Sequence, residues 1–399
     1  MTDQAGVREA RPDALAGWDD RTVRVPGGDV QQSRAWGEHR ARTGWTVHHL
    51  ELDDGSAVLA LGRPWPLLGG GRLYVPKGPV AAGATAAIVA ERLAAVAGWA
   101  RRAGYDAILA DAEIPSATGY PEALAAHGFR PVEEVGPSRH RVAAPIPAGA
   151  DDARLLATIA TTTRQMIVAA ERHGMRIVCH DAPPAIAAPR GEASPGEAPG
   201  GLATPGQGLV LPRLERPTED ATAAFERFHA LLAATGERRG FTIGPRSAAV
   251  AWWRAALAAG FLVFLEARTG DDAFLGAAIF YRNGERLTYA HSGDVVDLRR
   301  THPGASRLLL WRALQLAARE GRGELDLGGV DVAGARSEPR PGDPMYGLLE
   351  FKRSFGGRWV ELSGAHGLVL RPARARAGAA IAGAGRGARR LARSRGLGR

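Results

Sequence analysis

Lysine is almost absent from this chain of 399 residues. Of its 51 basic residues, only Lys77 and Lys352 are lysines, and the others are arginine. An ammonium is a compact charge with rotatable donors, whereas a guanidinium is a broad planar fork, so the two are not interchangeable where geometry matters. A sequence this rich in arginine is expected to keep lysine mainly where the chemistry requires it. Chance retention of an exposed lysine is the alternative at both positions.

Cysteine and long apolar runs are also scarce. Cys179 is the only cysteine, which excludes an intramolecular disulfide and leaves no basis for a cysteine-ligated metal cluster. We expect no metal and no bound cofactor. No stretch approaches the roughly 18 apolar residues of a spanning helix, and the first residues lack the basic-then-apolar pattern of a signal peptide. These absences predict a cytoplasmic protein.

Acidic residues are missing from one part of the chain. Residues 371–399 contain nine arginines and no Asp or Glu, and the formal net charge of the whole chain is +9. The first 370 residues are therefore close to neutral. A protein that coats nucleic acid in general would carry the positive charge on its folded body as well. This class of protein is therefore disfavoured.

Two segments are predicted to be irregular or weakly structured. Residues 181–219 are rich in Ala, Pro and Gly and have no helical or strand period, which is typical of a flexible insertion. Residues 373–399 form a basic, arginine-rich tail that can form an interfacial helix, although its glycines weaken the helix.

The sequence predicts the same order of strands and helices in each half of the chain. In the first half, a hairpin and a further strand precede a helix with apolar residues on one face, which ends at Gly104; a strand, a short helix and Gly128 follow. The ranges are 45–52, 57–61 and 72–75 for the first strands, 84–102 for the helix, 105–109 for the strand and 121–127 for the short helix. The second half repeats this order with strands at 261–266, 275–281 and 286–290, a helix around 310–317 and a strand at 325–327. The repetition indicates a tandem duplication.

This order is that of the GCN5-related N-acetyltransferase fold, in which an acyl donor and an amine meet where two central strands part. The fold alone suggests acetyl-CoA as the donor. The expected pyrophosphate loop is poor, however, because residues 299–305 contain one glycine and one proline.

Six short motifs occur along residues 32–372. They are QSRAWGE at 32–38 with Gly44-Trp45, YVPKGPV at 74–80, Thr163-Arg164 with AER at 170–172, ERRGF at 237–241, LDLGGV at 325–330 and FKRSFGG at 351–357. Each motif is weak by itself, but six in this order and spacing form a specific pattern. With this pattern the chain resembles the Fem family of peptidoglycan-bridge aminoacyl transferases, which are tandem acetyltransferase-like proteins.

The resemblance implies an α/β (α+β) chain of two tandem GCN5-related N-acetyltransferase-like domains, each a mixed, mostly antiparallel sheet flanked by helices. We predict a first domain at 1–147, completed by 358–372, and a second at 148–357 that contains the 181–219 insertion. The insertion has no heptads, so we expect no coiled-coil arm of the kind some family members carry.

The resemblance also implies a reaction. An amino acid would pass from an aminoacyl-tRNA to an amine on the stem peptide of a peptidoglycan precursor, either lipid-linked or nucleotide-linked. The site must then hold two large anionic substrates in register, accept a proton and stabilise a developing oxyanion. Aminoacyl-tRNA and the precursor are thus the implied partners, and aminoacyl-tRNA is a co-substrate rather than a cofactor.

Two residues of the last motif match the family's donor site. Lys352 matches a functional lysine and is assigned to stabilise the transition state or the tRNA ester; a phosphate-binding or solvated lysine is the alternative. Phe351 matches an aromatic residue that packs against the terminal adenosine of the tRNA.

Three basic residues are predicted to bind substrate. Arg40 and Arg238 match positions that bind phosphates or carboxylates of the precursor, which suits the bidentate guanidinium. An ordinary surface salt bridge is the alternative for both. Lys77 lies in a glycine-bearing loop of the first domain and is a phosphate-facing candidate.

Three further residues complete the predicted site. Asp111 matches an acidic residue at a strand end that orients or deprotonates an amine; capping of the next loop is the alternative. Tyr289 lies on a strand that faces the expected cleft, where half-buried packing is the alternative. His291 stands where relatives usually carry a tyrosine, and a neutral imidazole there would still hydrogen-bond to substrate.

The basic tail lies where relatives have a C-terminal helix. Its arginines would hold the enzyme at the inner face of an anionic plasma membrane. Binding of tRNA and simple solubilisation are the alternatives. Two other activities stay open on the same fold, namely an acyl-CoA-dependent N-acyltransferase and a non-catalytic protein that binds tRNA or precursor.

Overall fold

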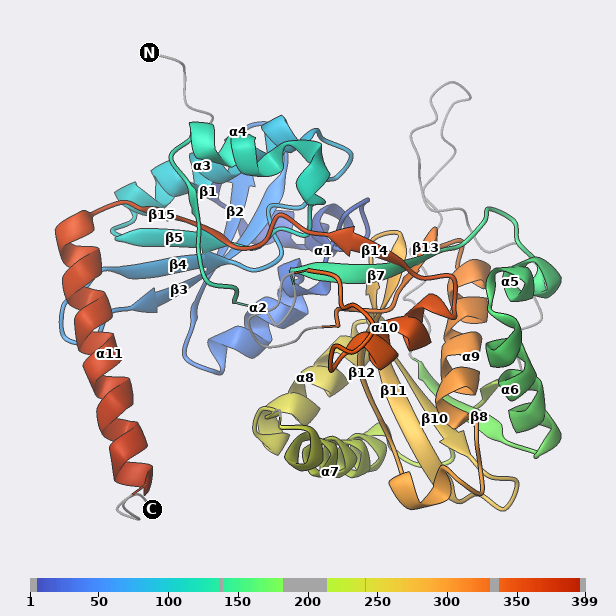
Figure 1. Cartoon of the computed structure of the whole chain (residues 1–399). Coiled ribbons are helices and arrows are strands. Elements are labelled where there is room, and N and C mark those ends of the chain that lie inside the picture. The colour runs from blue at the N-terminus through green and yellow to red at the C-terminus, as the bar shows by residue number, and fades with distance from the viewer. Residues whose placement is uncertain (1–5, 136–138, 182–213, 241, 331–336, 395–399) are drawn as a thin grey trace. The chain divides into compact units, whose positions relative to one another are not determined.

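The computed structural model describes residues 6–135, 139–181, 214–240, 242–330 and 337–394 (Figure 1). The chain forms two compact units. Unit 1 comprises Met1–Arg139 and Glu361–Arg399, and unit 2 comprises His140–Val360. Each unit is described by itself below.

Unit 1 is built on a seven-stranded sheet in which only one neighbouring pair, β4 and β5, is parallel. The strand order is β1 (Val7–Glu9), β2 (Thr46–Leu52), β3 (Ala57–Pro64), β4 (Gly71–Val75), β5 (Ala107–Ala110), β15 (His366–Val369) and β6 (Arg130–Pro131). The strand β15 comes from the C-terminal part of the chain and pairs with β5 from Val369↔Ala107 to His366↔Ala110.

The main helix of unit 1 is α3 (Ala86–Arg102), which covers the sheet with one apolar face. Val89, Leu93, Val96 and Ala100 recur at helical spacing and are fully buried. The helix begins after Thr85, whose hydroxyl accepts a hydrogen bond from the Ile88 amide, and the chain turns at Gly104, where φ is +94°. The other helices are η1 (Pro12–Leu15), α1 (Trp18–Thr22), η2 (Val30–Gln32), α2 (Arg34–Ala41), η3 (Ser116–Thr118), α4 (Tyr120–Ala126) and α11 (Pro372–Ser394).

Unit 2 repeats this plan with an eight-stranded sheet. The strand order is β14 (Arg358–Glu361), β7 (His140–Pro145), β13 (Glu324–Asp326), β12 (Arg286–Asp294), β11 (Phe274–Asn283), β10 (Leu262–Arg268), β8 (Arg176–Asp181) and β9 (Leu214–Glu215). The central pair β12 and β13 is parallel, as β4 and β5 are in unit 1. The predicted duplication is therefore visible in the sheets as well as in the order of elements.

Helix α9 (Ala305–Arg319) forms the centre of the unit 2 core, because it is apolar on nearly every side and buried along most of its length. Helices α7 (Ala221–Arg239) and α8 (Arg246–Ala258) pack on each other and on β12 and β10. Within the described residues, neither projects as a coiled-coil arm. The remaining helices are α5 (Asp152–Thr158), α6 (Thr161–Arg172), η4 (Val296–Leu298) and α10 (Tyr346–Arg353).

The predicted fold class is confirmed, while two boundaries and the structure of the tail differ in detail. The observed division falls at residue 139 rather than 147, because β7 pairs with β13 of the second sheet. The insertion predicted at 181–219 is ordered at both ends, since Asp181 ends β8 and β9 lies at Leu214–Glu215; residues 182–213 lie outside the described part. The tail forms the 23-residue helix α11 despite its glycines.

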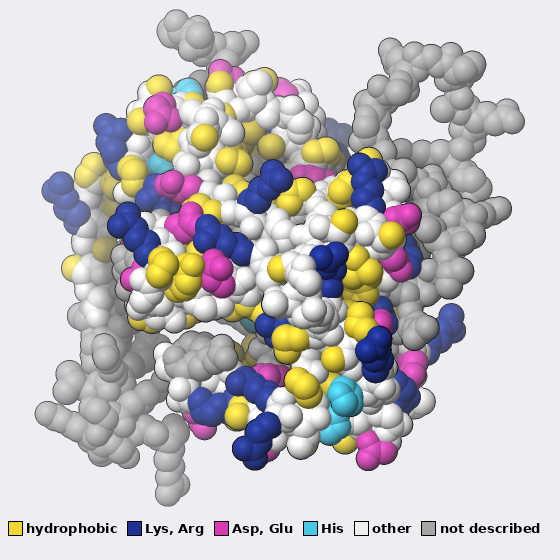
Figure 2. Space-filling model, turned by 45° about the vertical axis from the view of Figure 1, so that its right-hand side comes forward, with side chains coloured by type: hydrophobic (Ala, Val, Ile, Leu, Met, Phe, Trp, Pro, Cys, Tyr) yellow, Lys and Arg dark blue, Asp and Glu magenta, His cyan; other side chains and the backbone are white. Residues whose placement is uncertain are grey.

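The surface carries both signs of charge. On the face shown in Figure 2, basic side chains in dark blue are interspersed with acidic ones in magenta, with apolar side chains between them. This mixture agrees with the near-neutral body expected from composition. Among the described residues, no helix combines the length and the apolar character that crossing a membrane requires.

Candidate functional site

The parallel strands at the centre of unit 2 part after a short pairing. β12 pairs with β13 only from Arg286↔Glu324 to Thr288↔Asp326, although β12 continues to Asp294. An irregular register opposite Ile279 and Phe280 of β11 bends β12 at this point. The backbone beyond Thr288 is therefore free of β13 and faces a cavity.

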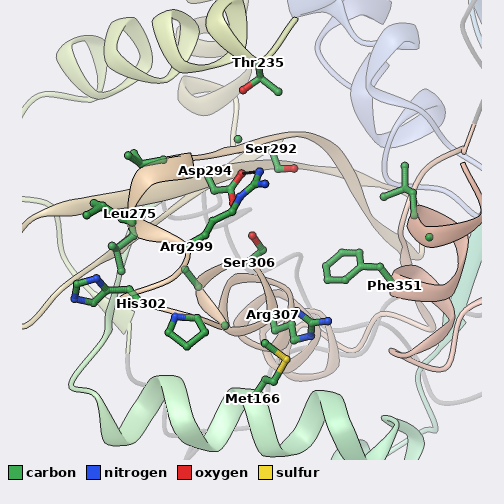
Figure 3. Close-up of a pocket in the computed structure, with 18 of the residues that line it drawn as sticks. Met166, Thr235, Leu275, Ser292, Asp294, Arg299, His302, Ser306, Arg307 and Phe351 are labelled. Atoms are coloured by element: carbon green, nitrogen blue, oxygen red, sulfur yellow. Dashed lines mark hydrogen bonds and ion pairs between the residues drawn. The ribbon is translucent and has the colours of Figure 1, made fainter. Parts of the chain in front are cut away.

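This cavity has a volume of about 710 Å³ and lies between the free part of β12, the beginning of α9 and helix α10 (Figure 3). Tyr289 and Phe351, both predicted site residues, line it. The lining also includes polar and charged groups, namely Thr235, Ser292, Asp294, Arg299, His302, Ser306 and Arg307, together with Met166, Leu275, Leu298 and Leu348. A cavity of this size, partly apolar and with a few convergent polar groups, suits an organic ligand that carries an anionic group.

The beginning of α9 supplies backbone donors to the cavity wall. Gly304 has φ of +97°, and a Cβ atom there would lie 2.7 Å from the Met166 carbonyl oxygen, so glycine is needed at this position. Ala305, Ser306 and Arg307 follow and line the cavity. The first amides of a helix have no partner within the helix and attract negative charge.

Arg307 and Phe351 form one wall of the cavity. The guanidinium carbon of Arg307 lies 5.3 Å from the centre of the Phe351 ring, and Figure 3 shows the two side chains next to each other. Burial lowers the pKa of Arg307, and within the described residues Arg307 has no carboxylate partner. Arg299, by contrast, is paired with Asp294. Arg307 is thus the cation of this cavity that is available to a ligand.

Lys352 is buried next to this cavity rather than in its wall. Its side chain is 4% exposed, and Nζ donates a hydrogen bond to the Gly329 carbonyl oxygen at 2.7 Å. Nζ also lies 5.9 Å from the centre of the Tyr289 ring, which lines the cavity. The reading of Lys352 as a solvated surface lysine is therefore wrong.

The loop after β13 holds the acceptor of that hydrogen bond. Asp326 ends β13, is paired with Arg286 and accepts a hydrogen bond from the Gly328 amide at 2.8 Å. Gly328 has φ of +68°, and a Cβ atom there would lie 3.0 Å from the Tyr289 carbonyl oxygen. The Leu325–Val330 motif is therefore a strand end and a tight turn that places the Gly329 carbonyl against Lys352.

His140 fixes the other end of this loop. The Val330 amide donates a hydrogen bond to Nε2 of His140 at 2.9 Å, and the imidazole stacks on Trp359 with ring centres 3.9 Å apart. Burial and the nearby Lys352 lower the pKa of His140 to about 4. At neutral pH the imidazole is therefore uncharged and can act as the acceptor.

In unit 1, the predicted residues Lys77 and Asp111 lie together. They follow β4 and β5, the parallel pair that corresponds to β12 and β13. Nζ of Lys77 is 3.4 Å from Asp111 and 3.3 Å from Glu113, and Asp111 also accepts hydrogen bonds from the Lys77 amide and the Tyr74 hydroxyl. Lys77, Asp111 and Glu113 thus form an ion cluster directly after the last paired residues of β4 and β5.

The environment of this cluster shifts the pKa values of Asp111 and Lys77. Burial raises the pKa of Asp111, although Lys77 acts in the opposite direction. Burial also opposes the charge of Lys77, but Glu113 and Asp111 outweigh it and raise the pKa of the ammonium above its ordinary value. Lys77 thus has carboxylate partners within the chain, and Asp111 is a buried carboxylate with enhanced affinity for a proton.

Arg40 lies between two tryptophans of unit 1. Its guanidinium carbon is 5.3 Å from the Trp36 ring centre and 5.0 Å from that of Trp45, and burial lowers its pKa. Among the described residues it has no carboxylate partner, so the alternative of an ordinary salt bridge is not supported.

The last two predicted residues lie around the cavity of unit 2. Arg238 is exposed near the end of α7 and donates a hydrogen bond to Thr235 at 3.2 Å, and Thr235 lines the cavity. His291 lies opposite Ile279 in the sheet, its ring is 6.1 Å from that of Trp253, and loss of hydration lowers its pKa to about 4. Among the described residues, no group of three or more His, Cys, Asp or Glu side chains is arranged to hold a metal.

Sequence reasoning missed two functional candidates. Arg307 stands three residues after the Gly304 that begins α9, so a search for an arginine in the first turn of the main helix would have found it. His140 carries no local signal, because its partners Val330 and Trp359 are about 190 and 219 positions away and are joined to it only by the sheet.

The comparisons with known proteins agree with this geometry. A family described as Acetyltransferase (GNAT) domain matches residues 205–353, within unit 2. The solved structure of FemX superposes with a TM-score of 0.69 at 16% identity, covering 92% of this chain and 98% of that one. The chain has the tandem acetyltransferase fold of FemX. The resemblance predicted from the six motifs is thereby confirmed at the level of the fold.

A second solved structure is less similar than FemX. A conserved protein of unknown function from Bacteroides thetaiotaomicron superposes with a TM-score of 0.50 at 11% identity, covering 91% of this chain and 98% of that one. No curated protein sequence matches the chain. The FemX-like fold and the acetyltransferase domain together support an acyltransferase.

Proposed function

We propose that the chain transfers an amino acid from aminoacyl-tRNA to an amine on the stem peptide of a peptidoglycan precursor. The observation that carries this proposal is the buried ammonium of Lys352, held against the Gly329 carbonyl next to the cavity where β12 and β13 part. A chain whose basic residues are nearly all arginine keeps a lysine here, and the compact ammonium differs in shape and donor geometry from the broad, planar guanidinium.

The cavity of unit 2 is proposed as the donor site. Phe351 offers an aromatic face, and Arg307 offers a cation that has no carboxylate partner among the residues the structure describes. Together they suit the base and phosphate of a terminal nucleotide. The backbone donors at the beginning of α9 would add to phosphate binding.

The reaction is an acyl transfer to an amine. The amine nitrogen attacks the ester carbonyl, a C–N bond forms, and the C–O bond to the tRNA ribose breaks after the amine has lost a proton. Positive charge near the ester stabilises the oxyanion that develops on the carbonyl oxygen, which is the role proposed for Lys352. The proton that the amine loses passes to water. Within unit 1, Asp111 stays a candidate for orienting or deprotonating an amine that binds there, because burial raises its pKa.

An acyl-CoA donor is the second candidate. The acetyltransferase family match and the position of the cavity at the beginning of α9 favour it. The loop at 299–305, however, has the single glycine Gly304 for the approach of a pyrophosphate, and its Arg299 is already paired with Asp294.

A donor assay tests the proposal. Full-length protein would receive a stem-peptide precursor with either labelled aminoacyl-tRNA or labelled acetyl-CoA, and label in the precursor would be measured. The proposal predicts incorporation from aminoacyl-tRNA. Incorporation from acetyl-CoA alone would replace it with the second candidate, and binding of aminoacyl-tRNA without any transfer would indicate a non-catalytic protein. The assay also separates lipid-linked from nucleotide-linked precursors, if each is offered in turn.

A further inference from the structure

A surface loop of unit 1 exposes two leucines, and neither packing nor backbone preference explains why leucine occupies these positions. The loop joins β3 and β4 and contains Leu67, which is 98% exposed, and Leu68, which is 37% exposed. Leu67 also has φ of +66°, a conformation that glycine or asparagine adopts far more readily than leucine. A large apolar side chain kept in a strained position without burial indicates a surface that meets something else.

The loop is joined to the beginning of α11. The Trp65 indole donates a hydrogen bond to Asp106 at 3.0 Å, and the fully buried Asp106 is 3.4 Å from Arg374 and 3.6 Å from Arg371. A Cβ atom on Gly378 would lie 2.3 Å from the Trp65 ring, so the helix backbone rests directly on the indole. Figure 1 shows α11 running past the ends of β3 and β4.

The helix that this contact anchors is strongly basic. Residues 371–399 contain nine arginines and no acidic residue. Arg374 and Arg376, in the first turns of the helix, are exposed, and α11 extends to Ser394. A segment this rich in arginine attracts an anionic lipid surface with about 1 kcal/mol per arginine near that surface.

We propose that the Leu67–Leu68 loop and α11 together form a docking surface for an anionic lipid bilayer. The leucines would enter the interface while the arginines bind lipid phosphates, and the contact of Trp65 with Gly378 would keep the two parts in register. RNA would also attract the arginines, but a phosphate backbone offers nothing to two exposed leucines. The apolar loop therefore favours a membrane over RNA as the partner.

Vesicle sedimentation with the full-length protein tests this inference and needs neither donor nor acceptor. We expect binding to vesicles that contain phosphatidylglycerol and little binding to phosphatidylcholine alone. The double variant Leu67→Ser/Leu68→Ser should bind the anionic vesicles at least tenfold more weakly, given the apolar area withdrawn from the interface. Because both leucines are exposed, these substitutions should leave the fold intact, which circular dichroism would verify.

Two matched variants sharpen the test. Ile88→Ser removes an apolar side chain that is 41% exposed on α3 of the same unit, and it should leave vesicle binding unchanged. Gly378→Val would displace Trp65 and should weaken binding even though both leucines remain. Equal binding by the double-leucine variant and the wild type would overturn the proposal. Absence of vesicle binding alongside tight binding of an RNA duplex would overturn it in favour of RNA.

Discussion

The neutral state of His140 makes the stability of unit 2 depend on pH. Its pKa is lowered from the ordinary value of 6.5 to about 4, first by burial and then by Lys352. Between these two values the unfolded chain binds a proton that the folded chain excludes, so the free energy of unfolding rises with pH in this window. The contribution is complete above about pH 6.5 and is lost as the pH falls towards 4.

The magnitude follows from the difference between the two pKa values. Each tenfold change in proton affinity corresponds to about 1.4 kcal/mol. The free energy of unfolding near pH 4 is therefore about 3 kcal/mol lower, on account of His140, than it is above pH 6.5. Substitution of His140 by glutamine would remove the titration and leave a side-chain oxygen that can accept from Val330. We therefore expect the free energy of unfolding of the variant to change less between pH 7 and pH 4.5 than that of the wild type, by about 2 to 3 kcal/mol.

Urea unfolding of the full chain at a series of pH values would measure this difference. Loss of hydration lowers the pKa of the half-buried His49 and of His291 to about 4 as well, so the comparison of variant with wild type, rather than the wild-type slope alone, isolates His140. His127→Gln, at an exposed position of unit 1, is the control and should leave the slope unchanged. The reasoning would be refuted if the His140→Gln and wild-type slopes were the same.

Two further predictions concern other charges of unit 2. Glu266 is fully buried, but hydrogen bonds from His180, Arg227 and Arg268 outweigh the effect of burial and lower its pKa to about 2. Glu266→Gln should therefore lower the free energy of unfolding at neutral pH by roughly 3 kcal/mol, which urea unfolding would show as a lower midpoint. An unchanged midpoint would contradict this prediction. Arg307→Gln should raise the KM for the nucleotide-bearing donor about tenfold with a smaller effect on kcat, and an unchanged KM would exclude Arg307 from the donor site.

Much of the fold was predictable because its central elements carry strong local signals. Helix α3 was expected at residues 84–102 and lies at Ala86–Arg102, since its apolar face and the glycine after it are both visible in the sequence. Strand β12 was expected at residues 286–290 but continues to Asp294, because its last residues follow an irregular register and lose the alternation that marks a strand. Of these last residues, Ser292, Gly293 and Asp294 line the cavity.

The candidate site was predictable only in part, because its geometry depends on distant contacts. Lys352, Tyr289 and Phe351 were expected together and do gather at one place in unit 2. The partners of Lys77 were not foreseen, since a glycine-bearing loop suggested a phosphate, whereas the chain folds Asp111 and Glu113 against the ammonium. Pairings between residues more than 30 positions apart leave no periodic trace in the sequence.

The central claim is that the ammonium of Lys352 promotes acyl transfer, and the single-turnover rate from bound aminoacyl-tRNA to precursor measures it most directly. We predict that Lys352→Ala lowers this rate by about 10² to 10³, as the loss of one oxyanion donor does. Lys352→Arg should fail to restore it, because a broad guanidinium would replace the compact ammonium that donates to the Gly329 carbonyl. The neighbouring Arg353→Gln, which removes an exposed side chain paired with Glu350, should retain the wild-type rate. A Lys352→Ala protein that is folded and transfers at the wild-type rate would contradict the account.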